Sequence, residues 1–371
     1  MKNGILIQSA NAIDHEAQEE FLRWVHESPW VDALKIRTQT TPGDLQVCYQ
    51  LSSQGLATFT PQHNTLHIRD SVHLQNTDPE QALMHEICLG LLSSPYPQIF
   101  PTHDELLSHV RVRKFIAQAA QFTSLKFDTR AVDRPMSHWA YDEELGFTLK
   151  PDRSLIEALQ LATQPKFSGT EFSFSCYRAS EYVILLGIAQ EAQISNPLLL
   201  ANLQRQWQIK AIASGAFHDT FLVEHGSLDA PVPMLHYIPG DRVWFRNPDP
   251  RSSNVSGYEG SWVIYMGAGL FSNFWNCKAP FTLDKKCLEV FHWRDGAFVD
   301  DAGLWCMDEA LVAQHVSKSM ADPQQQQSIL YAMKKYREPS GVYENGGCID
   351  ATRESPRLLR PQTCDIVLRD I

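Results

Sequence analysis

The stretch Phe172-Ser-Phe-Ser-Cys-Tyr-Arg-Ala-Ser-Glu-Tyr-Val-Ile-Leu-Leu-Gly-Ile-Ala-Gln190 changes its hydrophobic pattern at its cysteine. Before Cys176, phenylalanine and serine alternate, which predicts a short extended segment. From Tyr177 onward the chain is a mostly apolar run without proline, long enough for a buried helix. Cys176 therefore stands at the predicted helix start, where unpaired N–H groups and the helix dipole favour thiolate over thiol. A nucleophile needs this placement; a buried free cysteine that packs as a small hydrophobic side chain is the alternative.

The composition is that of an ordinary globular protein. Of the 371 residues, 43% are hydrophobic and 20% are charged, and a chain of this length is expected to form roughly two or three domains. The net charge of -11 argues against non-specific binding to nucleic acid or anionic lipid. No apolar run approaches a membrane span, and the N-terminus lacks a signal-peptide pattern. We therefore expect a cytoplasmic protein with no membrane or nucleic-acid partner; export as an effector is the alternative.

The eight cysteines carry no metal or disulfide signature. None forms a Cys-x-x-Cys pair, and the count is low for the length of the chain. A zinc ribbon and a disulfide scaffold are both poor fits to this spacing. We expect reduced thiols and no bound metal.

Shifts in pattern along the chain predict three domains. Residues 1–100 form an α+β module of unknown role, which a proline-dense linker at 94–101 connects to the rest. Residues 101–285 contain Cys176 and form the predicted catalytic domain. Residues 286–371 form an extension packed on the core, with a strand at 288–293 and irregular surface structure over about the last thirty residues.

The first module contains a helix with a metalloprotease-like motif. Pro79–Leu92 is a predicted helix, and within it Met84-His-Glu-Ile-Cys-Leu-Gly90 resembles the His-Glu-x-x-His helix of zinc peptidases. Leu89 stands where the second histidine belongs. Because two histidines one turn apart seat the zinc, His85 and Glu86 are predicted to lie on a structural helix. A zinc peptidase in this module is the alternative.

A sheet is predicted to follow the helix that Cys176 opens. Four short segments rich in β-branched and aromatic residues are separated by turns of glycine, proline and asparagine; they lie at 221–223, 234–238, 241–246 and 261–266. A cysteine at the start of a central helix, followed by an antiparallel sheet, is the chain order of papain-like folds. The predicted fold class is therefore α+β with a papain-like core, although fold alone assigns no activity.

Three stretches of the predicted catalytic domain carry a family resemblance. Phe172–Ile184 is one, His236-Tyr-Ile-Pro-Gly-Asp-Arg-Val-Trp-Phe-Arg-Asn-Pro-Asp249 is the closest, and Gly260-Ser-Trp-Val-Ile-Tyr-Met-Gly267 continues it. Together, over about residues 104–285, they resemble the bacterial spore-type transglutaminases, the protein-glutamine gamma-glutamyltransferases. The resemblance puts the family's catalytic cysteine on Cys176. It implies a papain-like fold and acyl transfer from a protein glutamine to a lysine, another amine or water, with release of ammonia and with no metal or organic cofactor.

The sequence departs from the family pattern at three positions. Ser261 stands where the family has the glutamate that pairs with its cysteine, Ser175 replaces a second glutamate, and Asn273 replaces a histidine. Glu259 is one substitute for the missing base, because residues two apart on a strand share a face and would place it beside Ser261. His236 is the other, since an imidazole within about 3 Å of the sulfur could hold a thiolate–imidazolium pair.

The sequence thus predicts a transglutaminase-like cysteine enzyme with Cys176 as nucleophile and Glu259 or His236 as base. The resemblance adds a glutamine-binding tunnel whose walls we assign to Trp244, Trp262, Phe271 and Asn273. Its partners would be a protein with an accessible glutamine and an amine or lysine acceptor. A glutamine deamidase or cysteine peptidase with the same nucleophile, and a catalytically dead binding module, are the alternatives.

Overall fold

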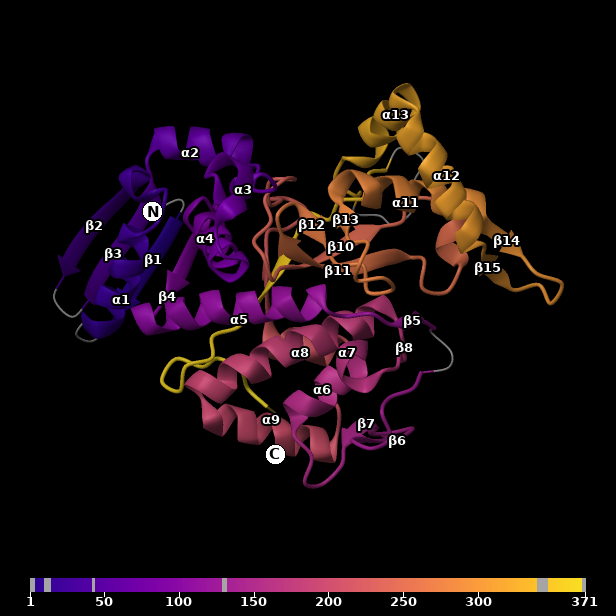
Figure 1. The fold of residues 1–371 in the computed structure, drawn as a ribbon, viewed down its shortest axis with the longest axis horizontal. Helices are drawn as coiled ribbons and strands as arrows, with labels where there is room; N and C mark the ends of the chain where they lie inside the picture. Colours follow the sequence, from indigo (N-terminus) through magenta and orange to yellow (C-terminus); the bar gives the residue numbers. More distant parts are fainter. Residues whose placement is uncertain (1–3, 10–14, 42–43, 129–131, 339–345, 369–371) are drawn as a thin grey trace.

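The computed structural model describes residues 4–9, 15–41, 44–128, 132–338 and 346–368. Helices and strands are mixed along the chain (Figure 1). They enclose three hydrophobic cores. The predicted α+β class is confirmed.

The N-terminal core lies beneath a four-stranded sheet. β1 (Gly4–Ser9) runs between β3 (Asp44–Leu51) and β4 (Pro97–Phe100), and β2 (Leu34–Thr41) is an edge strand. Helices α1 (His15–His26) and α4 (Pro79–Leu92) bury their apolar side chains in this core. The segment predicted as a linker at 94–101 therefore contains a strand, parallel to β1. Its proline is accommodated because β4 lies at the edge of the sheet.

The central core is built around two long helices. α5 (His103–Gln121) packs against α8 (Cys176–Ser195), and α6 (Leu155–Thr163), α9 (Pro197–Ile209) and α10 (Gly215–Phe221) complete the layer. The two long helices meet closely at Gly187, where an added Cβ would lie 2.8 Å from the backbone nitrogen of Ile116. A side chain at position 187 would therefore push α8 away from α5.

A six-stranded sheet lies beside α8, in the order β13-β12-β11-β10-β16-β9. Its strands are β9 (Leu222–His225), β10 (Arg242–Arg246), β11 (Gly260–Gly267), β12 (Leu270–Phe271), β13 (Phe281–Thr282) and β16 (Arg353–Pro356). Every ladder is antiparallel, as predicted. The predicted strand at 234–238 is absent; its residues lie in turns and extended chain between Pro233 and Pro239.

The end of the chain differs from the prediction of irregular surface structure. β16 is buried along its whole length and separates β10 from β9. Its side chains Arg353 and Glu354 are charged, so the strand has no hydrophobic pattern by which it could be predicted. Buried partners satisfy them: Arg353 donates to the carbonyl of His236, and Arg242 donates to Glu354. Residues 339–345 lie outside the described part of the chain.

Three helices cover the far side of this sheet and enclose the third core. They are α11 (Leu283–Gly296), α12 (Glu309–Ala321) and α13 (Pro323–Met333), with the hairpin of β14 (Ala297–Val299) and β15 (Trp305–Met307). The strand predicted at 288–293 is wrong, because these residues lie inside α11. Leu283, Cys287, Val290 and Trp293 are buried at helical spacing, and the Thr282 hydroxyl caps the helix start.

The remaining elements are short. They are α2 (Ser53–Phe59), α3 (Ile68–Ser71), α7 (Pro165–Ser168), the parallel pair β5 (Lys126–Phe127) and β8 (Ser173–Phe174), the hairpin β6 (Trp139–Asp142) and β7 (Gly146–Leu149), and single 3-10 turns at 31–33, 61–63, 74–76 and 252–254. None of the helices in the described ranges is long and apolar enough to cross a membrane.

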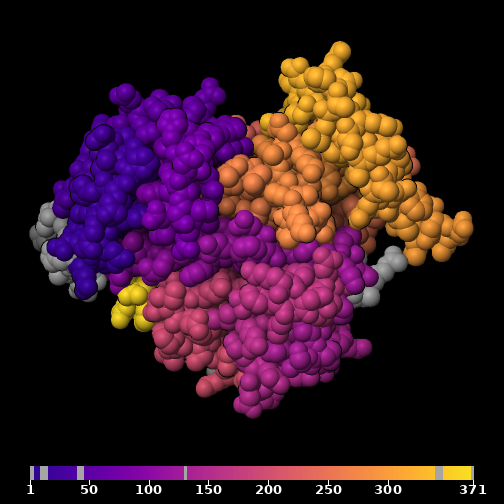
Figure 2. Space-filling model, in the orientation of Figure 1, coloured from indigo at the N-terminus to yellow at the C-terminus, as the bar shows by residue number. Residues whose placement is uncertain are grey.

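The C-terminal segment returns to the start of α5. The Glu105 carboxylate accepts the backbone N–H groups of Leu359 and Arg360 at 2.9 and 3.0 Å. In the space-filling view this segment (yellow) emerges below the N-terminal module (Figure 2). The predicted boundary at 285/286 falls within α11. The division into three domains remains a prediction.

Candidate active site

Cys176 is the first residue of α8, as the sequence predicted. The preceding strand β8 is fixed by its parallel ladder with β5 and by the fully buried ring of Phe174. Ser175 is the N-cap, and its hydroxyl accepts the backbone N–H of Arg178 at 3.2 Å. The serine that replaces a family glutamate therefore serves the helix start, which holds the thiol at a defined position.

Two backbone N–H groups point at the sulfur of Cys176. They belong to Tyr177, in the first turn of α8, and to Trp262 of β11. The N–H of Trp262 is free to point at the sulfur because the ladder between β11 and β12 reaches only as far as Tyr265. These donors lower the thiol pKa, but burial outweighs them and raises it. The predicted fall in the thiol pKa is thus wrong in its net direction, because the helix start is buried.

A cavity of about 430 Å³ opens beside Cys176. Ser261 and Asn273 line it from the sheet side. Its far wall comes from α11 and α12. The residues that line the cavity include Phe127, Tyr258, Trp275, Lys286, Glu289, Trp293, Glu309, Val312 and Val316. The cavity gives the thiol access to a ligand, with aromatic and aliphatic walls and a few charged groups.

Charged side chains near the cavity have opposite effects on the pKa of the Cys176 thiol. The Lys286 ammonium lowers the pKa of Cys176, and the Glu259 carboxylate raises it. Lys286 is only 3% exposed, and its Nζ donates to Glu289 at 2.7 Å. A buried ammonium near the sulfur stabilises a thiolate once one has formed.

A second acidic group reaches the cavity through a tyrosine. Tyr258 donates its hydroxyl to Glu309 of α12 at 2.5 Å. Burial and then Glu309 raise the pKa of Tyr258, and the charge of Cys176 adds to them. Sequence reasoning did not find Lys286, Glu289 or Glu309. They lie on helices far along the chain, and no spacing or motif in the sequence connects them with Cys176.

Comparison with known proteins identifies the family. The sequence profile of the protein-glutamine gamma-glutamyltransferases matches residues 64–364, more than half of the chain. The chain belongs to this family. Among solved structures, the transglutaminase from Geobacillus stearothermophilus (without C-terminal extension) is similar over 58% of this chain and 98% of that chain, with 19% identity and a TM-score of 0.39. No curated protein matches.

Family membership confirms the resemblance and supports a transglutaminase-like function. The match also extends beyond the stretch that sequence reasoning covered, into the N-terminal module on one side and past β16 on the other. The N-terminal boundary of the match lies at residue 64, before α3 and α4. The segment that carries those helices is thus part of the family sequence.

Glu259, the first substitute for the transglutaminase glutamate, lies at the rim of the cavity. It precedes β11 by one residue, and its neighbours Tyr258 and Gly260 both line the cavity. Its side chain is exposed, and its charge is among those that act on Cys176. The charge of Glu259 therefore acts on Cys176 from the rim of the cavity, although the strand does not extend back to residue 259.

His236, the second substitute, lies in different surroundings. It is fully buried beside Tyr96, and the charges that act on it belong to Arg353, His63, Arg113 and His225. Burial, first of all, lowers the pKa of His236 to about 3. Neither ring nitrogen has a hydrogen-bond partner among the described residues. The structure does not bring His236 to the thiol.

The predicted tunnel residues divide into three groups. Asn273 lines the cavity, and its amide donates to the carbonyl of Ala279. Trp244 and Trp262 lie opposite each other on β10 and β11, and their rings stack with centroids 5.7 Å apart. Trp262 also meets the Tyr177 ring edge-to-face, next to Cys176, but neither tryptophan is among the residues that line the cavity. Phe271 is fully buried in the third core, so the structure does not place it in the cavity wall.

His85 and Glu86, the metalloprotease-like pair on α4, make structural contacts. Glu86 is fully buried and accepts from Arg69 Nε at 2.7 Å, from the Tyr265 hydroxyl at 2.9 Å and from the Ala268 N–H. His85 stacks on Trp24 with ring centroids 4.8 Å apart. Glu86 thereby joins the N-terminal module to the turn after β11, as a structural helix requires.

Proposed function

We propose that the protein is a cysteine acyltransferase that acts on glutamine side chains of proteins, with Cys176 as its nucleophile. The observation that carries the proposal is the sulfur's position. It lies at a helix start, faces a cavity, and meets two backbone N–H groups and the charge of a buried lysine. A catalytically dead binding module would have no need of this combination.

The reaction begins with attack of the Cys176 sulfur on the carbonyl carbon of the glutamine carboxamide. Because burial raises the thiol pKa, the sulfhydryl proton needs an acceptor as the bond forms. We assign that role to Glu259, whose carboxylate acts on the sulfur. The proton then passes to the leaving amide nitrogen, ammonia departs, and a thioester remains.

The second half-reaction regenerates the thiol. A lysine or other amine attacks the thioester carbon, and its proton returns to sulfur by way of Glu259. Water in place of the amine would give glutamate, which is the deamidase alternative. We assign the oxyanion of both half-reactions to the N–H groups of Tyr177 and Trp262, which face the sulfur. Trp262 and Asn273 would contact the incoming glutamine chain.

Ammonia release from a glutamine-containing protein, with and without an amine acceptor, tests the proposal. We expect release by the wild-type chain and none by Cys176→Ala, because no thioester can form without the sulfur. Cys48→Ala is the matched control; this half-buried thiol lies on β3 of the N-terminal sheet, and its loss should leave release unchanged.

The products discriminate the alternatives. Incorporation of the amine indicates transamidation, glutamate alone indicates deamidation, and backbone cleavage indicates a peptidase. Unchanged release in Cys176→Ala would refute Cys176 as nucleophile. No release from a panel of glutamine proteins by folded wild-type protein would favour the binding module.

A further inference from the structure

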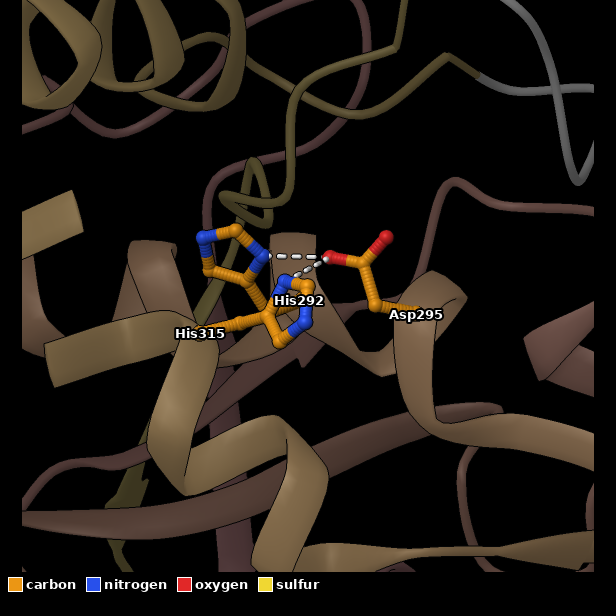
Figure 3. Close-up of side chains that lie close together, drawn as sticks. All are labelled: His292, Asp295 and His315. Atoms are coloured by element: carbon orange, nitrogen blue, oxygen red, sulfur yellow. Dashed lines mark hydrogen bonds and ion pairs between the residues drawn. The ribbon is translucent and has the colours of Figure 1, made fainter. Parts of the chain in front are cut away.

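Two histidines and an aspartate meet between α11 and α12. Asp295 Oδ2 lies 2.5 Å from His292 Nδ1 and 3.3 Å from His315 Nδ1, and both rings face this one oxygen (Figure 3). One donor atom from each residue falls within 4.8 Å of the other two. His292 and Asp295 are three residues apart on α11, and His315 comes from α12. Ligands at this helical spacing, completed from a neighbouring helix, are how helical bundles build metal sites.

A hydroxyl behind His292 orients its ring. Ser319 Oγ lies 2.7 Å from His292 Nε2, and both side chains are buried. An N–H on Nε2 that donates to Ser319 leaves the Nδ1 lone pair directed at Asp295, as in histidines that bind metals. In that tautomer the lone pair and the carboxylate oxygen are both acceptors, and a bound cation would satisfy both. His315 presents another nitrogen to the same oxygen, and a metal ion would serve all three atoms.

The charge and exposure of the cluster also suit a cation. Among the described residues, no lysine or arginine forms an ion pair with Asp295, whose carboxylate contacts the two imidazoles. His292 is 3% exposed, whereas Asp295 and His315 are about a third exposed, at 33% and 34%. The buried ligand fixes the geometry, and the two outer ligands leave an entry path. Nitrogen and carboxylate donors are those that zinc and similar divalent ions prefer.

We propose that His292, Asp295 and His315 bind a divalent transition-metal ion, with zinc as the type ion, which links α12 to α11. Zinc bonds of about 2.0–2.2 Å require only a small widening of the His292–Asp295 contact. Other residues of α12, Val312, Val316 and Ser317, line the cavity of Cys176. The ion thus fixes the helix that forms the far wall of the cavity. This site does not depend on the proposed acyl transfer.

Metal titration of the full-length chain tests the site without an activity assay. Cys176→Ala protein, stripped with a chelator, is titrated with zinc chloride by calorimetry and with cobalt chloride by absorption spectroscopy. We expect one ion per chain and a cobalt spectrum without the near-ultraviolet sulfur-to-metal band that a cysteine ligand would produce. Saturating zinc should raise Tm by about 2–4 °C or more.

Ligand variants locate the ion. His315→Ala and Asp295→Asn, both at partly exposed positions, should each weaken zinc binding by about 100-fold or more and remove the Tm shift. Ser319→Ala should weaken it by about 10- to 100-fold, the usual effect of losing the group that orients a ligand. His67→Ala is the matched control, because His67 and Asp70 are also three residues apart but are exposed and lack a third ligand nearby among the described residues.

Two results would overturn the site. One is the absence of saturable zinc or cobalt binding below millimolar concentration, which would leave Asp295 as a hydrogen-bond acceptor between two helices. The other is binding that survives both His315→Ala and Asp295→Asn in protein with a native circular dichroism spectrum, which would place the ion elsewhere.

Discussion

Helices α4 and α8 both carry reactive side chains in buried positions, yet their surroundings give them opposite roles. On α4, Glu86 is enclosed by Arg69, Tyr265 and the Ala268 N–H. On α8, Cys176 is also surrounded by donors, but it borders a cavity of about 430 Å³. A buried polar group stabilises the fold when other groups of the protein satisfy all its hydrogen bonds. A polar group that faces a cavity can still interact with a substrate.

The two helices also offer a direct comparison of cysteines. Cys88 lies on α4 with no exposed surface, and burial raises the pKa of its thiol. Burial raises the pKa of Cys176 as well, but that thiol is half-buried at a cavity wall. Both thiols have a raised pKa, but only Cys176 is accessible. A difference in their reactivity would therefore come from access to the sulfur and not from the thiol pKa.

The largest expected difference is in alkylation. At pH 7 we expect iodoacetamide to modify Cys176 at least about 10³-fold faster than Cys88, because Cys88 reacts only when its core opens. Mass spectrometry of peptides sampled over time measures both rates in one tube. Comparable rates for the two thiols, or Cys176 as the slowest cysteine, would contradict the distinction. In denaturant the two rates should converge.

The next largest effect concerns the role of Glu86. Glu86→Ala should lower the free energy of unfolding by about 3–5 kcal/mol, because it leaves Arg69 and two further donors without their acceptor. Urea denaturation followed by circular dichroism measures the change. Glu80→Ala is the matched control on the same helix, since the Glu80 side chain is 54% exposed and its pair with Lys114 should contribute about 1 kcal/mol or less. A Glu86 variant as stable as the control would remove the structural explanation.

Local patterns in the sequence predicted the parts of the site that depend on neighbouring residues. The Ser175–Cys176 helix start follows from a change of periodicity, and the strands that carry Trp244 and Trp262 follow from short β-branched and aromatic runs between turns. Glu86 on a structural helix followed from the missing second histidine. These features depend on residues within a few positions of one another, which is the range over which sequence patterns are informative.

Features formed by distant segments could not be predicted in the same way. β16 was missed because Arg353 and Glu354 are buried only by virtue of partners from distant segments, the carbonyl of His236 and the guanidinium of Arg242. The charge of Lys286 acts on the thiol from a helix whose segment 288–293 is as rich in apolar and aromatic residues as a strand. His236 resembled a catalytic histidine in sequence, but tertiary packing places it beside Tyr96. Each outcome depends on which segments meet in space.

A smaller effect tests the assignment of the base. Glu259→Gln should keep the fold and lower kcat/KM for ammonia release by about 10²-fold, the usual contribution of a general base. His236→Ala should cost less, because that ring lies away from the thiol. Glu309→Gln tests the other carboxylate linked to the cavity through Tyr258. A larger loss in Glu309→Gln than in Glu259→Gln would move the base to Glu309.

The smallest effect isolates the electrostatic contribution of Lys286. Its ammonium lowers the pKa of the Cys176 thiol, so Lys286→Met should move the pH midpoint of Cys176 alkylation upward and slow alkylation at pH 7. The loss should be less than about tenfold, because Glu289 already engages the ammonium. Lys285→Met is the matched control; Lys285 lines the same cavity but is not among the charges that act on the thiol. Lys286→Arg should restore the charge and most of the rate. A midpoint that does not move in Lys286→Met, or moves equally in Lys285→Met, would show that the backbone donors of Tyr177 and Trp262 alone stabilise the thiolate.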